Sequence, residues 1–186
     1  WDSWADENGS IGKAYGYQLG VKHKYKEGEF DQVDRVLYDL KHNPNSRRIL
    51  TNIYTFADLN EMHLYPCAYS MTFNVSGNKL NAILNQRSND MVTANNWNVV
   101  QYSLLLIMFA KVSGLEPGEL VHVIADAHIY DRHIPIFEEM LKNPVYDAPK
   151  LIIKRDVKDF YDFRVDDFAL EDYKATPLKT KIEVAI

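Results

Sequence analysis

The chain has one cysteine, and the residues that follow it are of types that could do covalent chemistry. Cys67 stands just before a β-like segment, 68–75, and a second such segment covers 80–85. The residues between them, 76–79 (Ser-Gly-Asn-Lys), favour a tight turn, so the two segments predict a hairpin. The second strand ends at residues 86–90 (Gln-Arg-Ser-Asn-Asp). Pairing would therefore place a thiol beside a cation, a hydroxyl and a carboxylate, which predicts a nucleophile next to an anion-binding site.

Arginine is the residue type that makes this arrangement chemically useful. Positive charge beside a cysteine favours the thiolate, which is the nucleophilic form. Arg87 lies on the strand paired with that of Cys67, and Arg47 and Arg48 follow a predicted helix. Guanidinium groups bind phosphate oxygens in pairs. Together with Ser88, these arginines suit a small substrate that carries a phosphate monoester.

Three polar side chains elsewhere could recognise the rest of such a substrate. Asn98 offers one acceptor and two donors, which suit a base or amide edge. His128 and Tyr130 would point the same way in an extended backbone, which favours contact with a ligand. A Cys-His-Asn hydrolase built from Cys67, His128 and Asn98 is a competing hypothesis. It ranks lower because the local sequence does not resemble such hydrolases.

The same residues also have plainer explanations, which the residue patterns alone leave open. A free cysteine is most often a small buried apolar residue. Arg47 and Arg48 could belong to a solvated turn, and Asn98 could cap free amides at a helix start. Tyr15, in an irregular glycine-rich segment, could be a packing residue.

Composition limits the class of protein. The 186 residues are 46% hydrophobic, which is enough for one domain with its own core. A net charge of −5 and a pI near 5.7 argue against broad nucleic-acid or membrane affinity, and no uncharged apolar run would span a bilayer. A single cysteine, with no cysteine–histidine cluster of zinc spacing, predicts a soluble cytoplasmic protein without a metal. Trp1 and the residues after it read like the middle of a structured segment, which predicts a piece of a longer protein.

The hydrophobic pattern predicts alternating helices and strands. Residues 29–42 have an apolar face at helical spacing. Residues 97–112 are apolar almost all round, which predicts a helix buried inside the fold. Residues 119–130 indicate a buried strand, and a further helix is expected at 131–142. We therefore predict an α/β fold.

Taken together, these motifs resemble the thymidylate synthase family, in the family's order and from Trp1 to Ile186. The resemblance implies an α/β (α+β) fold, with a mixed sheet that is flanked by helices and packs against its mate in a homodimer. It also implies that residues 1–186 are the C-terminal catalytic portion of a longer thymidylate synthase chain. The segments that carry it are residues 1–5, 15–16, 46–48, 65–67, 86–90, 97–98, 126–130 and 184–186.

The resemblance implies a reaction. Members of the family convert dUMP to dTMP, using 5,10-methylenetetrahydrofolate as a co-substrate that gives both the carbon and the hydride. Cys67 would add to C6 of the uracil, which makes C5 nucleophilic. Two alternatives remain: a dUMP or dCMP hydroxymethylase, and a nucleotide-binding or dimerisation fragment without catalysis. Asn98 favours uracil, because cytosine-acting relatives have an aspartate there.

Roles of single residues also follow from the resemblance. Gln86, Arg87 and Ser88 would bind dUMP, the last two through its phosphate. Asn98 would pair with uracil N3 and O4.

At the sugar, the resemblance assigns His128 and Tyr130 to the ribose hydroxyl. Tyr15 would lie near the proton-removal step, and Asp90 would face the pterin of the folate.

The family also contributes residues from the ends and from a second subunit. Arg47 and Arg48 would reach the phosphate bound by the other subunit, which implies an obligate homodimer. Trp1 would line the folate pocket, and Ala185 with Ile186 would close over the ligands.

Some positions depart from the family pattern. Ala68 stands where many members have histidine, and Asn89 stands where a second cysteine is common. Residues 93–96 (Thr-Ala-Asn-Asn) replace a loop with more glycine and proline. The family's N-terminal part, with a catalytic glutamate and another phosphate-binding arginine, cannot be mapped onto this sequence.

Overall fold

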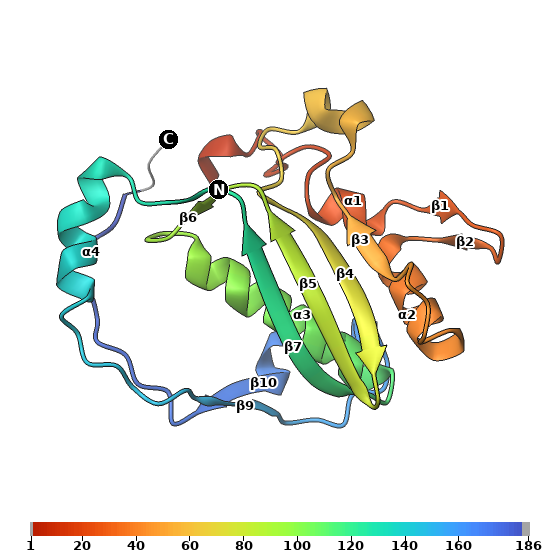
Figure 1. The fold of residues 1–186 in the computed structure, drawn as a ribbon. Helices are drawn as coiled ribbons and strands as arrows, with labels where there is room; N and C mark the ends of the chain where they lie inside the picture. Colours follow the sequence, from red (N-terminus) through yellow and green to blue (C-terminus); the bar gives the residue numbers. More distant parts are fainter. Residues whose placement is uncertain (1, 184–186) are drawn as a thin grey trace.

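A mixed four-stranded sheet is the centre of the computed structural model, which describes residues 2–183 (Figure 1). Its strand order is β3–β4–β5–β7. The strands are β3 (Leu50–Asn52), β4 (Ala68–Ser76), β5 (Lys79–Gln86) and β7 (Glu116–Ile124). β3, β4 and β5 are antiparallel neighbours, whereas β7 runs parallel to β5. The predicted mixed sheet is confirmed.

The predicted hairpin is confirmed as β4 and β5. Its register runs from Ser76 opposite Lys79 to Ala68 opposite Gln86. Gly77 has φ 60°, the left-handed conformation that a two-residue hairpin turn requires and that glycine adopts without strain. The hairpin therefore brings residue 67 and residue 87 to the same end of the sheet.

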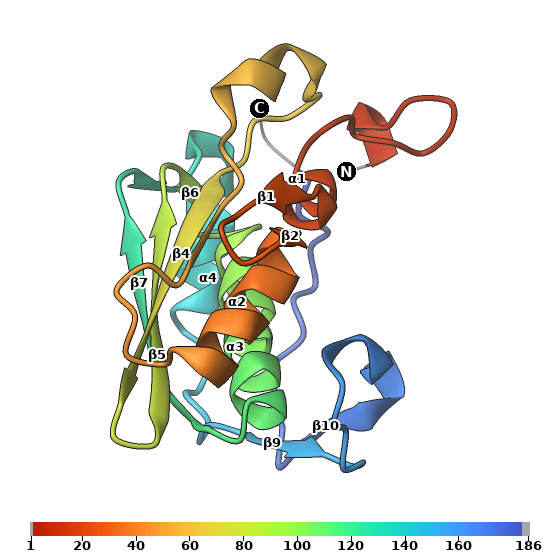
Figure 2. The same cartoon turned by 90° about the vertical axis from the view of Figure 1, so that its right-hand side faces the viewer.

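Helices α2 (Gln32–His42) and α3 (Asn95–Val112) cover one face of the sheet (Figure 2). α2 starts later than predicted because β2 (Glu29–Phe30) pairs with β1 (His23–Lys24). Asp31 then caps the helix by accepting from the Asp34 amide at 2.8 Å. α3 is the crossover that a parallel β5–β7 pair needs.

The core lies between these helices and the inner face of the sheet. Phe109 of α3 packs edge-on against Phe73 of β4 at 5.4 Å and stacks on Phe160 at 5.0 Å between ring centroids. The buried cluster comprises Val36, Leu40, Ile49, Ala68, Met71, Phe73, Leu80, Ala82, Leu84, Tyr102, Leu106, Phe109 and Ala110.

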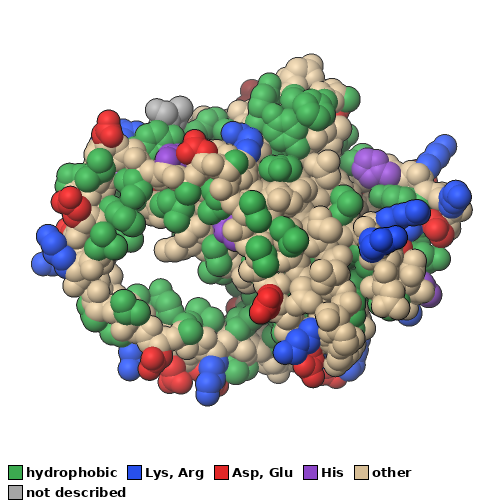
Figure 3. All heavy atoms as spheres, in the orientation of Figure 1, with side chains coloured by type: hydrophobic (Ala, Val, Ile, Leu, Met, Phe, Trp, Pro, Cys, Tyr) green, Lys and Arg blue, Asp and Glu red, His purple; other side chains and the backbone are tan. Residues whose placement is uncertain are grey.

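The remaining elements are short and surround the sheet. The segment predicted as a helix at 131–142 forms a 3-10 turn followed by α4, and α4 with the β9–β10 pair borders an opening visible in Figure 3. Within residues 2–183 no helix is long and apolar enough to cross a membrane. The α-helices and strands not yet given are α1 (Gly16–Gly20), β6 (Asn89–Asp90), β8 (Ala127–His128), α4 (Ile134–Met140), β9 (Lys150–Ile153) and β10 (Phe168–Glu171). The 3-10 helices are η1 (Asp2–Trp4), η2 (Phe56–Glu61), η3 (Asp131–His133), η4 (Phe160–Asp162) and η5 (Val165–Asp167).

Two burial predictions were wrong. The first turns of α3 are exposed, with Trp97 at 78% and Val100 at 56% of full exposure. β7 ends at Ile124, short of the predicted 119–130, and its outward side chains Val121 and Val123 are each 48% exposed. For β7 the physical reason is that the helices cover only the inner face of the sheet, so its outward side chains are not covered by any element within residues 2–183.

Gly12 allows a close approach between two segments that position the site. It forms a bridge with Met62, has φ 76°, and a Cβ there would lie 2.0 Å from the Glu61 carbonyl oxygen. Gly9 has φ 75° but nothing within 4 Å of a built Cβ. Gly9→Ala should cost about 1–2 kcal/mol for the left-handed backbone alone, and Gly12→Ala about 1–3 kcal/mol more for the clash.

Urea unfolding of both variants measures this difference. Equal losses of unfolding free energy would contradict the close approach, because the two glycines share the same φ.

Candidate active site

Cys67 lies one residue before β4, and its backbone is held on both sides. Its amide donates to the Tyr15 hydroxyl at 3.0 Å, and its carbonyl accepts from the Arg87 amide at 2.9 Å. These partners come from distant parts of the chain. The thiol is therefore fixed at the meeting point of the glycine-rich segment, β4 and the end of β5.

Arg87 wraps around the residues that precede the cysteine. Its Nε donates to the Pro66 carbonyl at 3.1 Å and its Nη2 to the Tyr65 carbonyl at 2.9 Å. The same Nη2 is 3.7 Å from Cys67 Sγ. The predicted pairing of thiol and guanidinium is thus present. The cysteine is half-buried and so stays accessible to a reactant.

Tyr15 approaches Cys67 from a strained backbone. It precedes α1 with φ 28° and ψ −92°, an uncommon conformation for a residue with a Cβ. Burial raises the pKa of the Tyr15 hydroxyl well above its usual range, and the hydrogen bond from Cys67 only partly offsets this. The hydroxyl therefore stays protonated at neutral pH and acts as an uncharged group.

Gln86 supports the polar run that follows it. Its side chain is buried, and Nε2 donates to the Ser88 carbonyl at 2.9 Å. Its Oε1 lies 2.8 Å from His122 Nε2, so that nitrogen carries the proton. Burial lowers the pKa of His122, which keeps the imidazole neutral. The Gln86 amide is thus engaged with protein groups and orients the backbone of Ser88.

Asp90 is ordered by its own loop and by β8. It pairs with His128 in the parallel β6–β8 ladder. Its Oδ1 accepts from the amides of Val92 and Thr93, and its Oδ2 accepts from the Thr93 hydroxyl. Burial opposes ionisation, but these hydrogen bonds outweigh it and lower the pKa of Asp90. The carboxylate is therefore charged at neutral pH and has lone pairs left for a further donor.

Two positions that depart from the family pattern contact each other. Asn89 Nδ2 donates to Asn95 Oδ1 at 2.9 Å. Asn98, predicted to recognise a base, donates through Nδ2 to the Ala94 carbonyl at 2.8 Å. It therefore does not cap free amides, and no side chain caps the α3 start. The side-chain oxygen of Asn98, Oδ1, remains an acceptor in the first turn of α3.

His128 and Tyr130 lie together, as their spacing predicts. Their ring centroids are 5.1 Å apart with perpendicular planes. His133 was missed by the sequence argument, although it follows Tyr130 closely. Its ring is buried, its Nε2 is 2.8 Å from the Glu183 carbonyl, and its Nδ1 is 3.9 Å from Asp90 Oδ2. It links the C-terminal segment to the Asp90 end of the site.

Arg47 and Arg48 are not near Cys67 of the same chain. They are exposed and precede β3, whose Leu50 pairs with Thr72 near the middle of β4. Arg47 lines a shallow cavity of about 350 Å³ with Thr72 and its neighbours up to Val75. At about 3.3 Å per strand residue, Thr72 is roughly 16 Å from Cys67, with both arginines further along.

The predictions for Trp1 and Ala185 lie outside residues 2–183. Across that range, no group of three or more histidine, cysteine, aspartate or glutamate side chains is arranged to hold a metal ion.

Comparisons with known proteins agree over the whole chain. The model of the family described as thymidylate synthase matches residues 1–186. The thymidylate synthase of Bacillus licheniformis is 49% identical over 187 aligned residues, which cover 100% of this chain and 67% of that protein. The thymidylate synthase of Bacillus phage phi3T is 46% identical with the same coverage. A solved structure, thermostable thymidylate synthase A from Bacillus subtilis, superposes with a TM-score of 0.93 at 44% identity, covering 100% of this chain and 67% of that one.

The Arg87 contacts predict the reactivity of the thiol. Arg87→Met should slow alkylation of Cys67 by iodoacetamide about fivefold at neutral pH, since an exposed charge contact is worth up to about 1 kcal/mol. Arg87→Lys should recover only part of the rate, because lysine lacks the planar fork that reaches two carbonyls and the sulfur. Intact mass follows the reaction cleanly in a chain with one cysteine. Lys79→Met, at the hairpin turn, is the matched loss of charge and should leave the rate unchanged.

Proposed function

This chain belongs to the thymidylate synthase family, whose members methylate dUMP reductively to dTMP, and we propose that Cys67 is the nucleophile of that reaction. The observation that carries the proposal is the position of the only cysteine. It is half-buried, fixed by Tyr15 and Arg87, and has a guanidinium nitrogen 3.7 Å from its sulfur. A neighbouring cation and a rigid backbone are what an attacking thiolate needs.

In the proposed mechanism, Cys67 forms a bond from Sγ to C6 of the uracil, and the displaced electron pair moves toward C5 and O4. C5 takes up a one-carbon unit and loses its proton, and Sγ leaves C6 as the methyl group is completed. Arg87 and Ser88 bind the phosphate, and Gln86 holds Ser88 in place from behind. Tyr15 takes part in proton transfer through a neutral hydroxyl, which its burial supports.

Asn98, His128 and Tyr130 are proposed to select the nucleotide. The Asn98 oxygen would accept from N3–H of uracil. The His128 and Tyr130 rings, which are in edge-to-face contact, would bind the ribose hydroxyl. These assignments give a site that recognises base, sugar and phosphate at the same time.

The folate would supply the one-carbon unit and the hydride and leave as dihydrofolate. Asp90 is the side chain whose environment fits the pterin. It is ionised, its orientation is fixed by three hydrogen bonds, and it can accept another from an N–H group. Trp1 and Ala185 are proposed to complete this pocket. The proposal needs no metal, and it includes a cytoplasmic location, which a single unpaired cysteine supports.

A covalent trap tests the proposed nucleophile. Incubation with 5-fluoro-dUMP and 5,10-methylenetetrahydrofolate should give one adduct per chain in the intact mass, since fluorine at C5 blocks the proton loss that releases the enzyme. Cys67→Ala should give none. Absence of an adduct from the unaltered protein, with the thiol still open to iodoacetamide, would overturn the proposal.

We also propose a homodimer in which Arg47 and Arg48 serve the partner's site. Their distance from Cys67 of the same chain supports this assignment. The outer face of the sheet supports the dimer, because hydrophobic side chains lie on it among uncharged polar ones while most charges lie toward its edges (Figure 3). The exposed apolar side chains on these strands are Leu50, Ile83, Val121 and Val123.

Loss of that apolar face should separate the subunits. Val121→Lys places a charge on the apolar face of the proposed interface and should convert the dimer to monomers in sedimentation velocity. Val145→Lys is the matched control, since Val145 is 99% exposed and lies off the sheet. A monomeric unaltered protein, or a Val121→Lys variant that remains dimeric, would contradict an interface on this face.

A further inference from the structure

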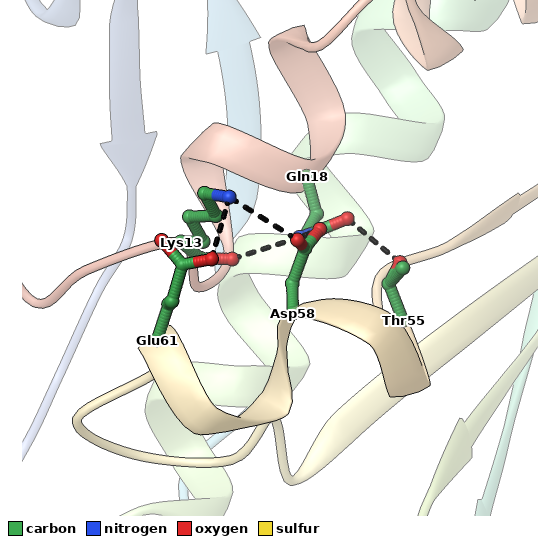
Figure 4. Close-up of polar contacts among 5 residues, drawn as sticks. All are labelled: Lys13, Gln18, Thr55, Asp58 and Glu61. Atoms are coloured by element: carbon green, nitrogen blue, oxygen red, sulfur yellow. Dashed lines mark hydrogen bonds and ion pairs between the residues drawn. The ribbon is translucent and has the colours of Figure 1, made fainter.

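A cluster of five polar side chains joins the segment that carries Tyr15 to the segment that leads to Cys67 (Figure 4). We call this group, Lys13, Gln18, Thr55, Asp58 and Glu61, the polar clamp. Lys13 Nζ is 2.8 Å from Glu61 Oε1 and 3.3 Å from Asp58 Oδ1. One cation is thus shared by two carboxylates on the same turn, η2.

Gln18 is the buried centre of the clamp. It is 1% exposed, and its Nε2 donates to Asp58 Oδ2 and to the Lys13 carbonyl, both at 2.9 Å. Its Oε1 accepts from the Thr55 hydroxyl at 2.7 Å. Every polar atom of this amide is therefore engaged, and a buried network that is fully satisfied holds its members in one geometry.

A backbone hydrogen bond also joins the same two segments. The Lys13 amide donates to the Glu61 carbonyl at 2.9 Å, next to the bridge between Gly12 and Met62. The clamp therefore grips the chain on both sides of Tyr15, at Lys13 and at Gln18. On the other side, the clamp binds η2, and a short loop runs from η2 to Cys67.

The strained backbone of Tyr15 must be held in place by its surroundings. Its φ of 28° is sparsely populated for a non-glycine residue and persists only where the surroundings fix the flanking chain. Its hydroxyl nevertheless accepts the Cys67 amide at 3.0 Å, a contact that a small backbone relaxation would break. Among the described residues, no hydrogen bond or ion pair joins a clamp side chain to the Cys67 sulfur, whose neighbour is Arg87.

We propose that Lys13, with Asp58, Glu61 and Gln18, is a positioning device that holds Tyr15 in its strained conformation and thereby sets the Tyr15 hydroxyl against the Cys67 amide. The inference rests on the proposed role of Cys67 as nucleophile. It adds residues outside the site that act only through Tyr15. Weakening the clamp would let Tyr15 relax, free the Cys67 backbone and shift the sulfur away from Arg87.

The rate of Cys67 alkylation by iodoacetamide measures the effect without substrate or folate. Lys13→Met should slow it about threefold, Gln18→Met more, and Lys13→Arg should restore it, since exposed ion pairs are worth up to about a factor of five. Glu61→Gln separates position from charge. A clamp predicts a slower rate again, whereas a simple field effect at the thiolate predicts a faster one. Lys111→Met breaks a comparable ion pair with Asp156 and should change nothing.

A double-mutant cycle with Tyr15→Phe tests whether the clamp acts through Tyr15. In that background Lys13→Met should slow alkylation by less than about 1.5-fold, because coupled residues lose their effects together. Full additivity, or a faster Glu61→Gln variant, would overturn the inference. The 5-fluoro-dUMP adduct of the unaltered protein reports the proposed function separately, so failure of one is not mistaken for failure of the other.

Discussion

The hydrogen bond between the Cys67 amide and the Tyr15 hydroxyl is the contact on which the arrangement of this site depends. Cys67 stands one residue before β4, at the end of the sheet ladder. On one side the Arg87 amide extends the ladder by one bond. On the other side only a residue from far away in the sequence can complete the hold, and Tyr15 does so at the cost of an unusual backbone conformation. The register of the sheet and the strained loop at Tyr15 thus together fix the position of the thiol.

The second constraint is that the elements of residues 2–183 cover only one face of this sheet. A sheet can leave one face to solvent when its outward residues are polar, but here Val121 and Val123 of the parallel strand β7 are apolar. A second copy of the chain would satisfy that face. It would also explain why two arginines are placed along β3, away from the thiol of their own chain. The exposed apolar face and the position of the two arginines are thus both consistent with the proposed dimer.

Much of the site could be predicted because its signals are local. The Gly77 turn fixes the hairpin register as far as Ser70, and a β-bulge between Ala68 and Ser70 then shifts the register by one residue, which brings Arg87 to Cys67. The resemblance then ordered the remaining motifs. Burial was harder to predict from the sequence. The apolar residues of α3 and β7 show that a face is hydrophobic, but they do not show which element or partner covers it. Gln18 and the strain at Tyr15 carry no sequence signal, since both arise only when distant segments meet.

The polar loop after Asp90 shows how departures from a family pattern can support one another. Asparagine at position 89 places a buried amide where a small thiol is common, and an unpaired amide there would cost about 1–3 kcal/mol. Asn95 offsets part of that cost by accepting a hydrogen bond from Asn89 Nδ2, while the buried Asn89 Oδ1 has no hydrogen-bond partner among the described residues. Thr93 likewise hydrogen-bonds the carboxylate of Asp90 rather than adding apolar surface. The contact between Asn89 and Asn95 and the contact between Thr93 and Asp90 thus hold this loop through polar groups at positions that depart from the family pattern.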